Sequence, residues 1–383
     1  MDLTFSPPLH KQRHQFVVDF VKRNKPKKVV DLGCGECTLL KMLKFHHEIE
    51  LLVGVDVNGA KVKKRMHGLA PISTDYLEPS YDQLCVELYQ GSVTQKDARF
   101  KGFDLVTSIE LIEHLTPADV ELFSEVVFGY MTPKMVIIST PNSEFNIFMP
   151  GVSCYRHSDH KFEWTRAEFR SWAMKVCLDY GYEVEFTGVG KAPQGQQEAV
   201  GFCTQIGVFY QLWGRDCCKT LLVNDAEDLF PYTLLYRVNY PSLCDNNILR
   251  RVLVSEVLYG AEKLKNRWME EQADGICDAV ALGPVHHAGE IVAVPLDVLW
   301  SCCPKVSVLS GSLGNLKHLL MDEPNIKLSQ DSSAVLINHW EQGIAPNSRD
   351  EPVLSNKKAQ QDSLIKKLKL INLITKIVIN LYL

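Results

Sequence analysis

The sequence predicts an α/β fold, in which a mostly parallel, Rossmann-like sheet is covered by helices and carries an antiparallel hairpin at one edge. Between about residues 16 and 209, short apolar strand-like segments alternate with helix-like segments, as they do in a parallel sheet. The last two strand-like segments flank a loop at 188–201 that contains Gly, Gln and Pro, which is typical of a hairpin. Apolar residues make up 46% and charged residues 23% of the chain, as in an ordinary globular protein.

The individual elements follow from the apolar pattern and its breaks. Strands are expected at 28–32, 51–56, around Tyr89, and at 103–109, 135–139, 182–186, 201–209 and 232–240. Helices are expected at 15–23, from about Thr38, near Leu111, and at 166–180 and 249–269. No coherent core pattern is visible in 271–312 or 323–361. We therefore divide the chain into an N-terminal helix and basic segment (1–27), an α/β domain (28–240) and a C-terminal region of uncertain order (241–383).

Composition also bears on the compartment. Twelve cysteines are scattered along the chain, and its start lacks the basic and apolar segments of a secretion signal. We therefore expect reduced thiols in a cytoplasmic protein. We also expect the protein to be a monomer. Four lysines interrupt the apolar stretch 364–383, which disfavours a membrane span. The net charge of −5 excludes a surface that is basic overall, so nucleic acid would need a local basic patch.

A candidate cofactor site follows the first predicted strand, where residues 31–35 read Asp-Leu-Gly-Cys-Gly. Glycine permits a sharp turn and lets a ligand lie against the backbone. The second strand ends at an aspartate whose carboxylate can accept both hydroxyls of an adenosine ribose. A serine after the third strand is expected beside the adenine. The expected cofactor contacts are Asp31, Gly33, Gly35, Asp56 and Ser92.

NAD is the competing ligand for such a turn. Thr38 stands where the third glycine of its binding motif would be, and Glu36 would face the pyrophosphate unfavourably. S-adenosylmethionine has no phosphate and carries a positive sulfonium, so an acidic turn suits it better. We therefore predict a class I S-adenosylmethionine-dependent methyltransferase fold. Cys34 and Cys37 are better explained as small buried residues than as a redox pair.

A candidate metal site follows the strand at 103–109, where residues 110–114 read Glu-Leu-Ile-Glu-His. If these residues are helical, Glu110, Glu113 and His114 share one face and can converge. Two carboxylates and an imidazole form a partial shell for a divalent cation. Metal-free methyltransferases of the ubiquinone pathway carry a similar run. A metal-free small-molecule O-methyltransferase is therefore an alternative.

A second histidine segment, 157–165, follows the fifth strand and is expected beside the same edge of the sheet. His160 can bring another imidazole to the cluster. Lys161 can supply a positive charge for a phosphate, while Phe162 and Trp164 can stack on a base. The alternatives are a surface position for His157 and a packed core position for Trp164.

Together these motifs resemble one family, the small-RNA 2′-O-methyltransferases that modify the 3′-terminal ribose, in animals mainly of piRNAs. The matching segments are 31–35, 110–114, 139–145, 159–165 and 184–190, within a resemblance that covers about residues 5–240. It implies a metal site of Glu110, Glu113, His114 and His160. It also implies the animal form, which acts on single strands presented by a Piwi-type protein in RNA-mediated gene silencing, in the cytoplasm and its RNA granules.

The expected chemistry explains why these residue types are needed. A divalent ion bound to a ribose 2′-hydroxyl stabilises the alkoxide and lowers the pKa of the hydroxyl. If the ion also contacts the 3′-hydroxyl, it would select a terminal nucleotide whose 2′- and 3′-hydroxyls are both free. Either His114 or His160 is expected to take the proton. Mn²⁺ or Co²⁺ suits a mixed oxygen and nitrogen shell by affinity, and the resemblance implies Mg²⁺.

One further alternative is a non-catalytic module that binds RNA ends. It would retain the fold and bind RNA without transferring a methyl group. The basic N-terminal stretch, which includes Lys11 and Arg13, is either a contact for the RNA backbone or a solvated helix face.

Overall fold

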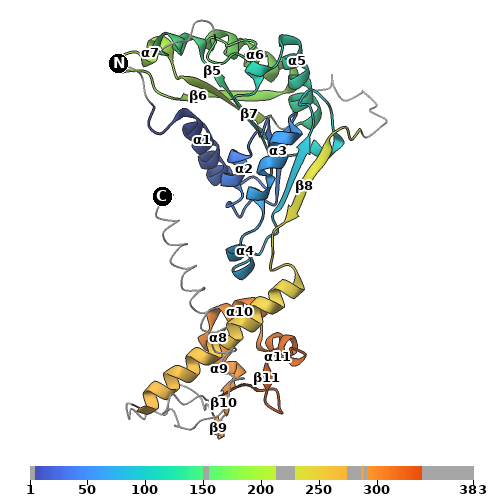
Figure 1. Cartoon of the computed structure of the whole chain (residues 1–383), viewed down its shortest axis with the longest axis vertical. Coiled ribbons are helices and arrows are strands. Elements are labelled where there is room, and N and C mark those ends of the chain that lie inside the picture. The colour runs from blue at the N-terminus through green and yellow to red at the C-terminus, as the bar shows by residue number, and fades with distance from the viewer. Residues whose placement is uncertain (1–4, 150–154, 213–228, 274–285, 289–290, 339–383) are drawn as a thin grey trace, which may run out of the picture.

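An eight-stranded sheet forms the centre of the molecule in the computed structural model, which describes residues 5–149, 155–212, 229–273, 286–288 and 291–338. The strand order is β6-β7-β5-β4-β1-β2-β3-β8 (Figure 1). Strands β1 to β5 run parallel, while β7 and β8 pair antiparallel with their neighbours. The strands are β1 (Lys28–Leu32), β2 (Leu51–Asp56), β3 (Cys85–Gln90), β4 (Leu105–Ile109), β5 (Met135–Pro141), β6 (Tyr182–Val189), β7 (Thr204–Gln211) and β8 (Thr233–Asn239).

Helices cover both faces of this sheet. Strand residues are buried on alternate sides, so that Val29 packs in one core while Val30 and Leu32 pack in the other. Helices α1, α2 and α3 contribute to the first core, and α5, α6 and a π-helix at Glu125–Met131 contribute to the second. The helices of this part are α1 (Leu9–Asn24), α2 (Thr38–Leu43), α3 (Gly59–Arg65), α4 (Ser73–Leu77), α5 (Pro117–Ser124), α6 (Arg166–Tyr180) and α7 (Gln197–Val200).

The predicted fold class is confirmed. The hairpin of β6 and β7 lies at one edge of the mostly parallel sheet, and β8 closes the opposite edge against β3. Strand β1 ends before Gly33, β2 ends at Asp56 and β3 ends before Gly91, so glycine or aspartate marks the end of these three strands. Helix α6 keeps its predicted bounds because Thr165 and Glu168 form a capping box and Gly181 ends the helix with φ 75°.

The prediction of a helix near Leu111 is wrong. Glu110 has φ 53°, and only Ile112–His114 form a single 3₁₀ turn. The true helix, α5, begins at Pro117, because Thr116 caps it by accepting the Asp119 N–H and proline suits the first helical position. The side chains of residues 110, 113 and 114 therefore do not share a helix face. Any convergence among them comes from loop geometry.

The C-terminal region contains a second, smaller folded unit. Its core draws on α8, β10, β12 and the helices between them, with Leu253, Val292 and Leu299 all 0% exposed. The elements are α8 (Asn246–Ala273), β9 (His286–Ala288), β10 (Ile291–Pro295), α9 (Leu296–Cys302), α10 (Pro304–Ser310), α11 (Leu313–Met321), β11 (Lys327–Leu328) and β12 (Ala334–Asn338). The four short strands form a sheet in the order β11-β12-β10-β9. None of the helices in the described ranges is both long and apolar enough for a membrane span, and the stretch 364–383 lies outside those ranges.

Candidate active site

The glycine turn after β1 is bonded to the end of β2. The N–H groups of Gly33 and Cys34 both donate to the Val55 carbonyl, at 2.8 and 3.0 Å. The Gly35 N–H donates to Asp56 Oδ2 at 2.8 Å, and the Asn58 N–H donates to Asp56 Oδ1 at 2.8 Å. Gly33 and Gly35 have φ 79° and 53°, which other residues adopt only with strain. The turn and the predicted ribose acceptor thus form one rigid unit at the carboxyl edge of the sheet.

Asp31 lies beneath this turn and is 4% exposed. Its Oδ1 accepts a hydrogen bond from the Thr107 hydroxyl at 2.7 Å, and its Oδ2 has no hydrogen-bond partner among the described residues. Burial raises the pKa of Asp31 to about 7. A cationic ligand group beside Oδ2 would favour the ionised carboxylate, so the position suits the ammonium group of an amino-acid ligand.

The other residues of the predicted cofactor site and of its glycine turn have structural roles in this structure. The Ser92 hydroxyl lies 2.8 Å from the Thr94 hydroxyl and accepts the Thr94 N–H at 3.3 Å, so in this structure it stabilises a turn. Its contact with adenine stays a prediction. Cys34 and Cys37 are both free and buried, in agreement with a packing role.

Glu110 follows β4 and is held by three groups. Its N–H donates to the Ser139 carbonyl at 3.1 Å, and its Oε1 accepts from the Ser139 hydroxyl at 3.0 Å. Its Oε2 lies 3.2 Å from Nη1 of Arg13 on α1. This ion pair explains the role of Arg13. From the sequence, Arg13 could have been either a contact for the RNA backbone or part of a solvated helix face. Its side chain is 17% exposed and contacts the candidate site instead of projecting from the helix.

Glu113, His114 and His160 do converge. One ligand atom from each lies within 4.8 Å of the other two, and the two imidazole rings are 4.9 Å apart at their centroids. The loop that carries His160 is fixed to the first motif, because the Lys161 N–H donates to the Glu113 carbonyl at 2.7 Å. Three of the four predicted ligands are therefore brought together. Glu110 is not part of this set, since its carboxylate is bound to Arg13 and Ser139.

Each imidazole of the cluster uses Nδ1 to contact a carboxylate. His114 Nδ1 lies 3.1 Å from Asp159 Oδ2, and His160 Nδ1 lies 2.7 Å from Glu163 Oε1. A carboxylate at this distance takes an Nδ1–H, which leaves the Nε2 lone pair available as a ligand. Metal-ligating histidines usually have such a carboxylate partner. Burial lowers the pKa of His114, which favours the neutral ring that a metal requires, although the Asp159 charge opposes this.

Glu113 also has the properties of a metal ligand. Its side chain is 0% exposed, and Oε2 accepts the Thr140 hydroxyl at 3.0 Å. Its Oε1 is buried with no hydrogen-bond partner in the described part of the chain. Burial, followed by the charge of Glu110, holds the pKa of Glu113 well above its ordinary value. A divalent cation would satisfy the unpartnered oxygen and offset both effects, so these residues fit a metal ion.

Two functional side chains were not singled out from sequence. Asp159 and Glu163 lie inside the motif at 159–165, in which roles were predicted only for other residues, such as His160 and Lys161. The available signal was their spacing from the histidines, since Glu163 follows His160 at i+3 and Asp159 directly precedes it. His157, 67% exposed at its side chain, pairs with Asp159 and lies outside the cluster.

The aromatic residues of this motif have a packing role. Phe162 stacks on Trp164 with centroids 4.5 Å apart, and Trp164 contacts Phe169 and Trp172 at 6.3 and 5.5 Å. Both Phe162 and Trp164 are packed against the core between the sheet and α6. Of the two possibilities for Trp164, the structure favours the packed core position.

Comparison with known proteins gives concordant matches. A family model described as the HENMT1 C-terminal domain matches residues 283–339. A small RNA 2′-O-methyltransferase of Gallus gallus is 42% identical over an alignment of 364 residues, which covers 88% of this chain and 95% of the relative. The enzyme of the same name from Mus musculus is 42% identical over 371 residues, 88% of this chain and 92% of the relative.

A solved structure supports the fold. The crystal structure of the small RNA methyltransferase HEN1 matches with a TM-score of 0.52 and 30% identity. The match covers 63% of this chain and 28% of that longer chain. The α/β architecture described above is therefore a methyltransferase architecture.

Proposed function

The chain belongs to the small RNA 2′-O-methyltransferase family, and from this premise we propose how its site acts. The enzyme transfers a methyl group from S-adenosylmethionine to the 2′-hydroxyl of the 3′-terminal nucleotide of small single-stranded RNAs. The observation that carries the proposal is the cluster of Glu113, His114 and His160 at the same sheet edge as the glycine turn and Asp56. Methyl donor and acceptor hydroxyl can therefore meet at this edge.

The donor side depends on the turn and two carboxylates. The glycines let the cofactor lie against the backbone, while Asp56 accepts the ribose hydroxyls and Asp31 Oδ2 accepts the ammonium of the methionine part. Backbone hydrogen bonds already hold Asp56 in place, so little ordering is needed when the cofactor binds. The methyl group must lie in line between the sulfur and the 2′ oxygen, and this positioning supplies much of the rate.

The acceptor side would use a divalent cation, for which Mg²⁺, Mn²⁺ and Co²⁺ are the candidates. Glu113, His114 and His160 would hold it, and when bound it lowers the pKa of the 2′-hydroxyl. Asp159 and Glu163 orient the imidazoles. Glu110, fixed by Arg13 beside the cluster, adds negative charge near the site. A histidine whose Nε2 binds the ion has no free lone pair, so His114 or His160 would take the proton of the hydroxyl only while its own Nε2 is not bound to the ion.

The biological setting follows from the family and belongs to the same proposal. The substrates are piRNAs presented by a Piwi-type protein, and methylation protects their 3′ ends during RNA-mediated gene silencing in the cytoplasm. Methylation removes the free vicinal diol, which is the chemical basis of the protection and of its assay.

A periodate assay tests the reaction. The full chain is incubated with labelled S-adenosylmethionine and a single-stranded RNA that ends in a free 3′-hydroxyl, and the RNA is then treated with periodate. We expect labelled RNA that resists oxidation, and no label on an RNA whose 3′ end is phosphorylated. RNA that stays fully oxidisable contradicts the proposed reaction. Full activity in EDTA contradicts the metal.

A further inference from the structure

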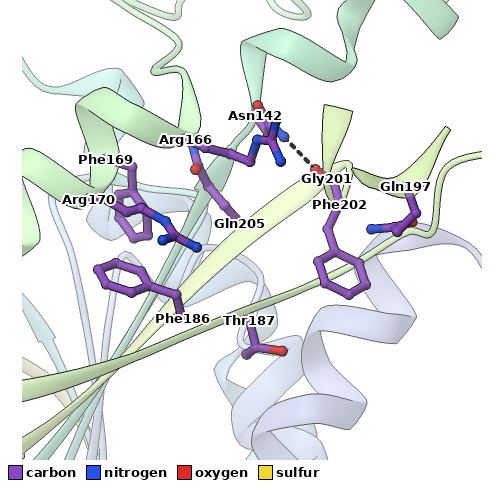
Figure 2. Close-up of a pocket in the computed structure, with 10 residues that line it drawn as sticks. All are labelled: Asn142, Arg166, Phe169, Arg170, Phe186, Thr187, Gln197, Gly201, Phe202 and Gln205. Atoms are coloured by element: carbon purple, nitrogen blue, oxygen red, sulfur yellow. Dashed lines mark hydrogen bonds between the residues drawn. The ribbon is translucent and has the colours of Figure 1, made fainter. Parts of the chain in front are cut away.

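A cavity of about 250 Å³ opens between α6, the edge strand β6 and the segment that follows α7. Figure 2 shows Phe186 and Phe202 on opposite sides of this cavity, with Gln205 above them in this view. None of the residues described above as ligands of the cofactor or of the metal lines it. The lining also includes no carboxylate among the described residues.

The floor of the cavity is polar and rigid. Asn142 is 0% exposed, and its Nδ2 donates to the carbonyls of Val200 and Phe202 at 2.7 and 2.8 Å. Gln205 is 6% exposed, and its Nε2 donates to the carbonyls of Pro141 and Trp164 at 3.1 and 3.0 Å. These bonds use the floor amides to fix the loops, so the cavity is preformed.

This floor adjoins the candidate active site. The Asn142 carbonyl accepts a hydrogen bond from the Arg156 guanidinium, and the Arg156 N–H donates to Glu163 Oε1 at 2.6 Å. The same Glu163 oxygen contacts His160. One chain of hydrogen bonds thus connects the cavity to the histidine of the metal cluster. Only Arg156 and Glu163 stand between Asn142 of the cavity floor and His160 of the cluster along this chain of hydrogen bonds.

The mouth of the cavity carries an uncompensated cation and free hydrogen-bond donors. The Arg170 guanidinium is exposed, lies 5.0 Å from the centroid of Phe186 and has no carboxylate partner among the described residues. Arg166, in contrast, is paired with Glu144 at 2.6 Å. The Gln197 amide nitrogen makes no hydrogen bond within the described ranges. A stacking surface and donors are therefore presented together.

We propose that this cavity binds a nucleotide upstream of the 3′-terminal one in the RNA substrate, an inference that rests on the proposed function. Phe202 offers an aromatic face to any base, and Arg170, which lies over the Phe186 ring, offers its charge to a phosphate. The amide donor on Gln197 suits an oxygen of a ribose or of a base edge. Since every base has a π-face, the subsite favours single strands without reading their sequence.

The test uses a ladder of single-stranded RNAs from about two to about eight nucleotides that share one 3′ end. For the wild type we expect KM to fall once the RNA is long enough to reach the cavity. Arg170→Glu, and separately Phe202→Leu, which keeps an apolar side chain but removes the ring, should abolish that fall. On the longest RNA, KM should rise about 10-fold with kcat within about twofold, because the stacking and the phosphate contact contribute to binding alone.

Lys175→Glu is the matched control, because it makes the same charge reversal on α6 and its residue does not line the cavity. It should keep the length dependence of the wild type. If the KM curves of Arg170→Glu and Phe202→Leu coincide with that of Lys175→Glu, or if KM of the wild type does not depend on length, the subsite is wrong. A wild type that methylates no RNA of the ladder would instead contradict the proposed function.

Discussion

Asp31 combines deep burial with an incomplete set of hydrogen bonds. Its raised pKa, about 7, means that the folded protein keeps a proton on this carboxyl in a pH range where the unfolded chain, with the ordinary aspartate pKa of 3.8, has released it. Below the lower pKa the carboxyl is neutral in both states. Between the two values the folded state binds more protons, so the free energy of unfolding falls as pH rises. The carboxyl thus makes the ligand-free protein less stable at neutral pH than in mild acid.

Asp31→Asn is therefore expected to remove this part of the pH dependence. The amide oxygen can still accept the Thr107 hydroxyl, and no charge develops in the buried position as pH rises. Urea unfolding of the ligand-free wild type at pH about 5 and about 8 should show lower stability at the higher pH. The difference between the two values should be smaller in Asp31→Asn. An equal difference in both proteins would show that Asp31 is not the group responsible.

Glu163 fixes the orientation of His160 although it lies outside the cluster. Its side chain is fully buried and both oxygens accept hydrogen bonds: Oε1 from the Arg156 N–H and His160, and Oε2 from the Asn146 amide at 2.7 Å. These donors lie at both oxygens of Glu163, so both oxygens must be acceptors. A glutamine offers only one acceptor atom and forces a donor against another donor.

Glu163→Gln should therefore weaken metal binding about 10- to 100-fold, because the His160 ring loses the partner that holds its tautomer. Calorimetric titration with Mn²⁺ measures this directly, and circular dichroism checks that the variant is folded. Glu168→Gln is the control, since it makes the same change of side chain at the start of α6 and glutamine preserves a capping box. Equal Mn²⁺ affinity in the two variants would assign Glu163 a packing role only.

At the scale of elements, the glycine turn contacts the loop after β4. A Cβ on Gly33 would lie 2.8 Å from Leu111 Cδ1, closer than real Cβ atoms come, and the residue has φ 79°. Gly102 has a similar φ of 72°, but a Cβ there would meet nothing within 4 Å. The two positions therefore separate the cost of the backbone conformation from the cost of the contact.

Gly102→Ala is expected to lower the free energy of unfolding by about 1–2 kcal/mol, the cost of a left-handed alanine. Gly33→Ala should cost up to about 1 kcal/mol more, because only the flexible end of the half-buried Leu111 side chain must move. It should also weaken binding of S-adenosylhomocysteine, which Gly102→Ala leaves unchanged. Urea unfolding and calorimetric titration measure the two effects. Equal losses of stability in both variants would mean that the turn and the loop are not in tight contact.

Elements of the large sheet could be predicted because its inner strands are short, largely apolar runs, while β6 and β8 alternate apolar and polar residues. The run at 28–32 became β1 without a shift, and the run at 51–56 became β2. The 3₁₀ turn at Ile112–His114 was missed because the Glu-Leu-Ile-Glu-His spacing also fits a helix. The signal against a helix was Thr116-Pro117, a cap followed by proline, which places the helix start later.

The candidate site was predictable in its residue types and less so in its contacts. Glu113, His114 and His160 were expected together because each follows the carboxyl end of a strand. The pairing of Glu110 with Arg13 could not be foreseen, since it depends on how α1 packs against the sheet, 97 positions away in sequence. The short elements of the C-terminal unit have too few turns or residues to show a period.

For the molecule as a whole, the chain has separate cores. The two cores of the large sheet are formed by residues up to Tyr240, and the third core is formed by residues from Leu253 onward. The connection between them is polar: the Leu243 N–H donates to the Ser80 carbonyl at 2.9 Å, and the Arg251 guanidinium donates to the Tyr76 carbonyl at 3.1 Å. Few hydrophobic contacts couple such units, so they can unfold independently.

Two unfolding transitions are therefore expected in a calorimetric scan of the full chain. Leu299→Ala should destabilise the C-terminal unit by about 2–5 kcal/mol and lower one transition, because Leu299 is 0% exposed in the third core. Leu105→Ala, at an equally buried position in β4, should lower the other. S-adenosylhomocysteine should raise only the transition that Leu105→Ala lowers, because a ligand stabilises the unit that binds it. A single transition that both substitutions lower and the ligand raises would show instead that the two units fold as one.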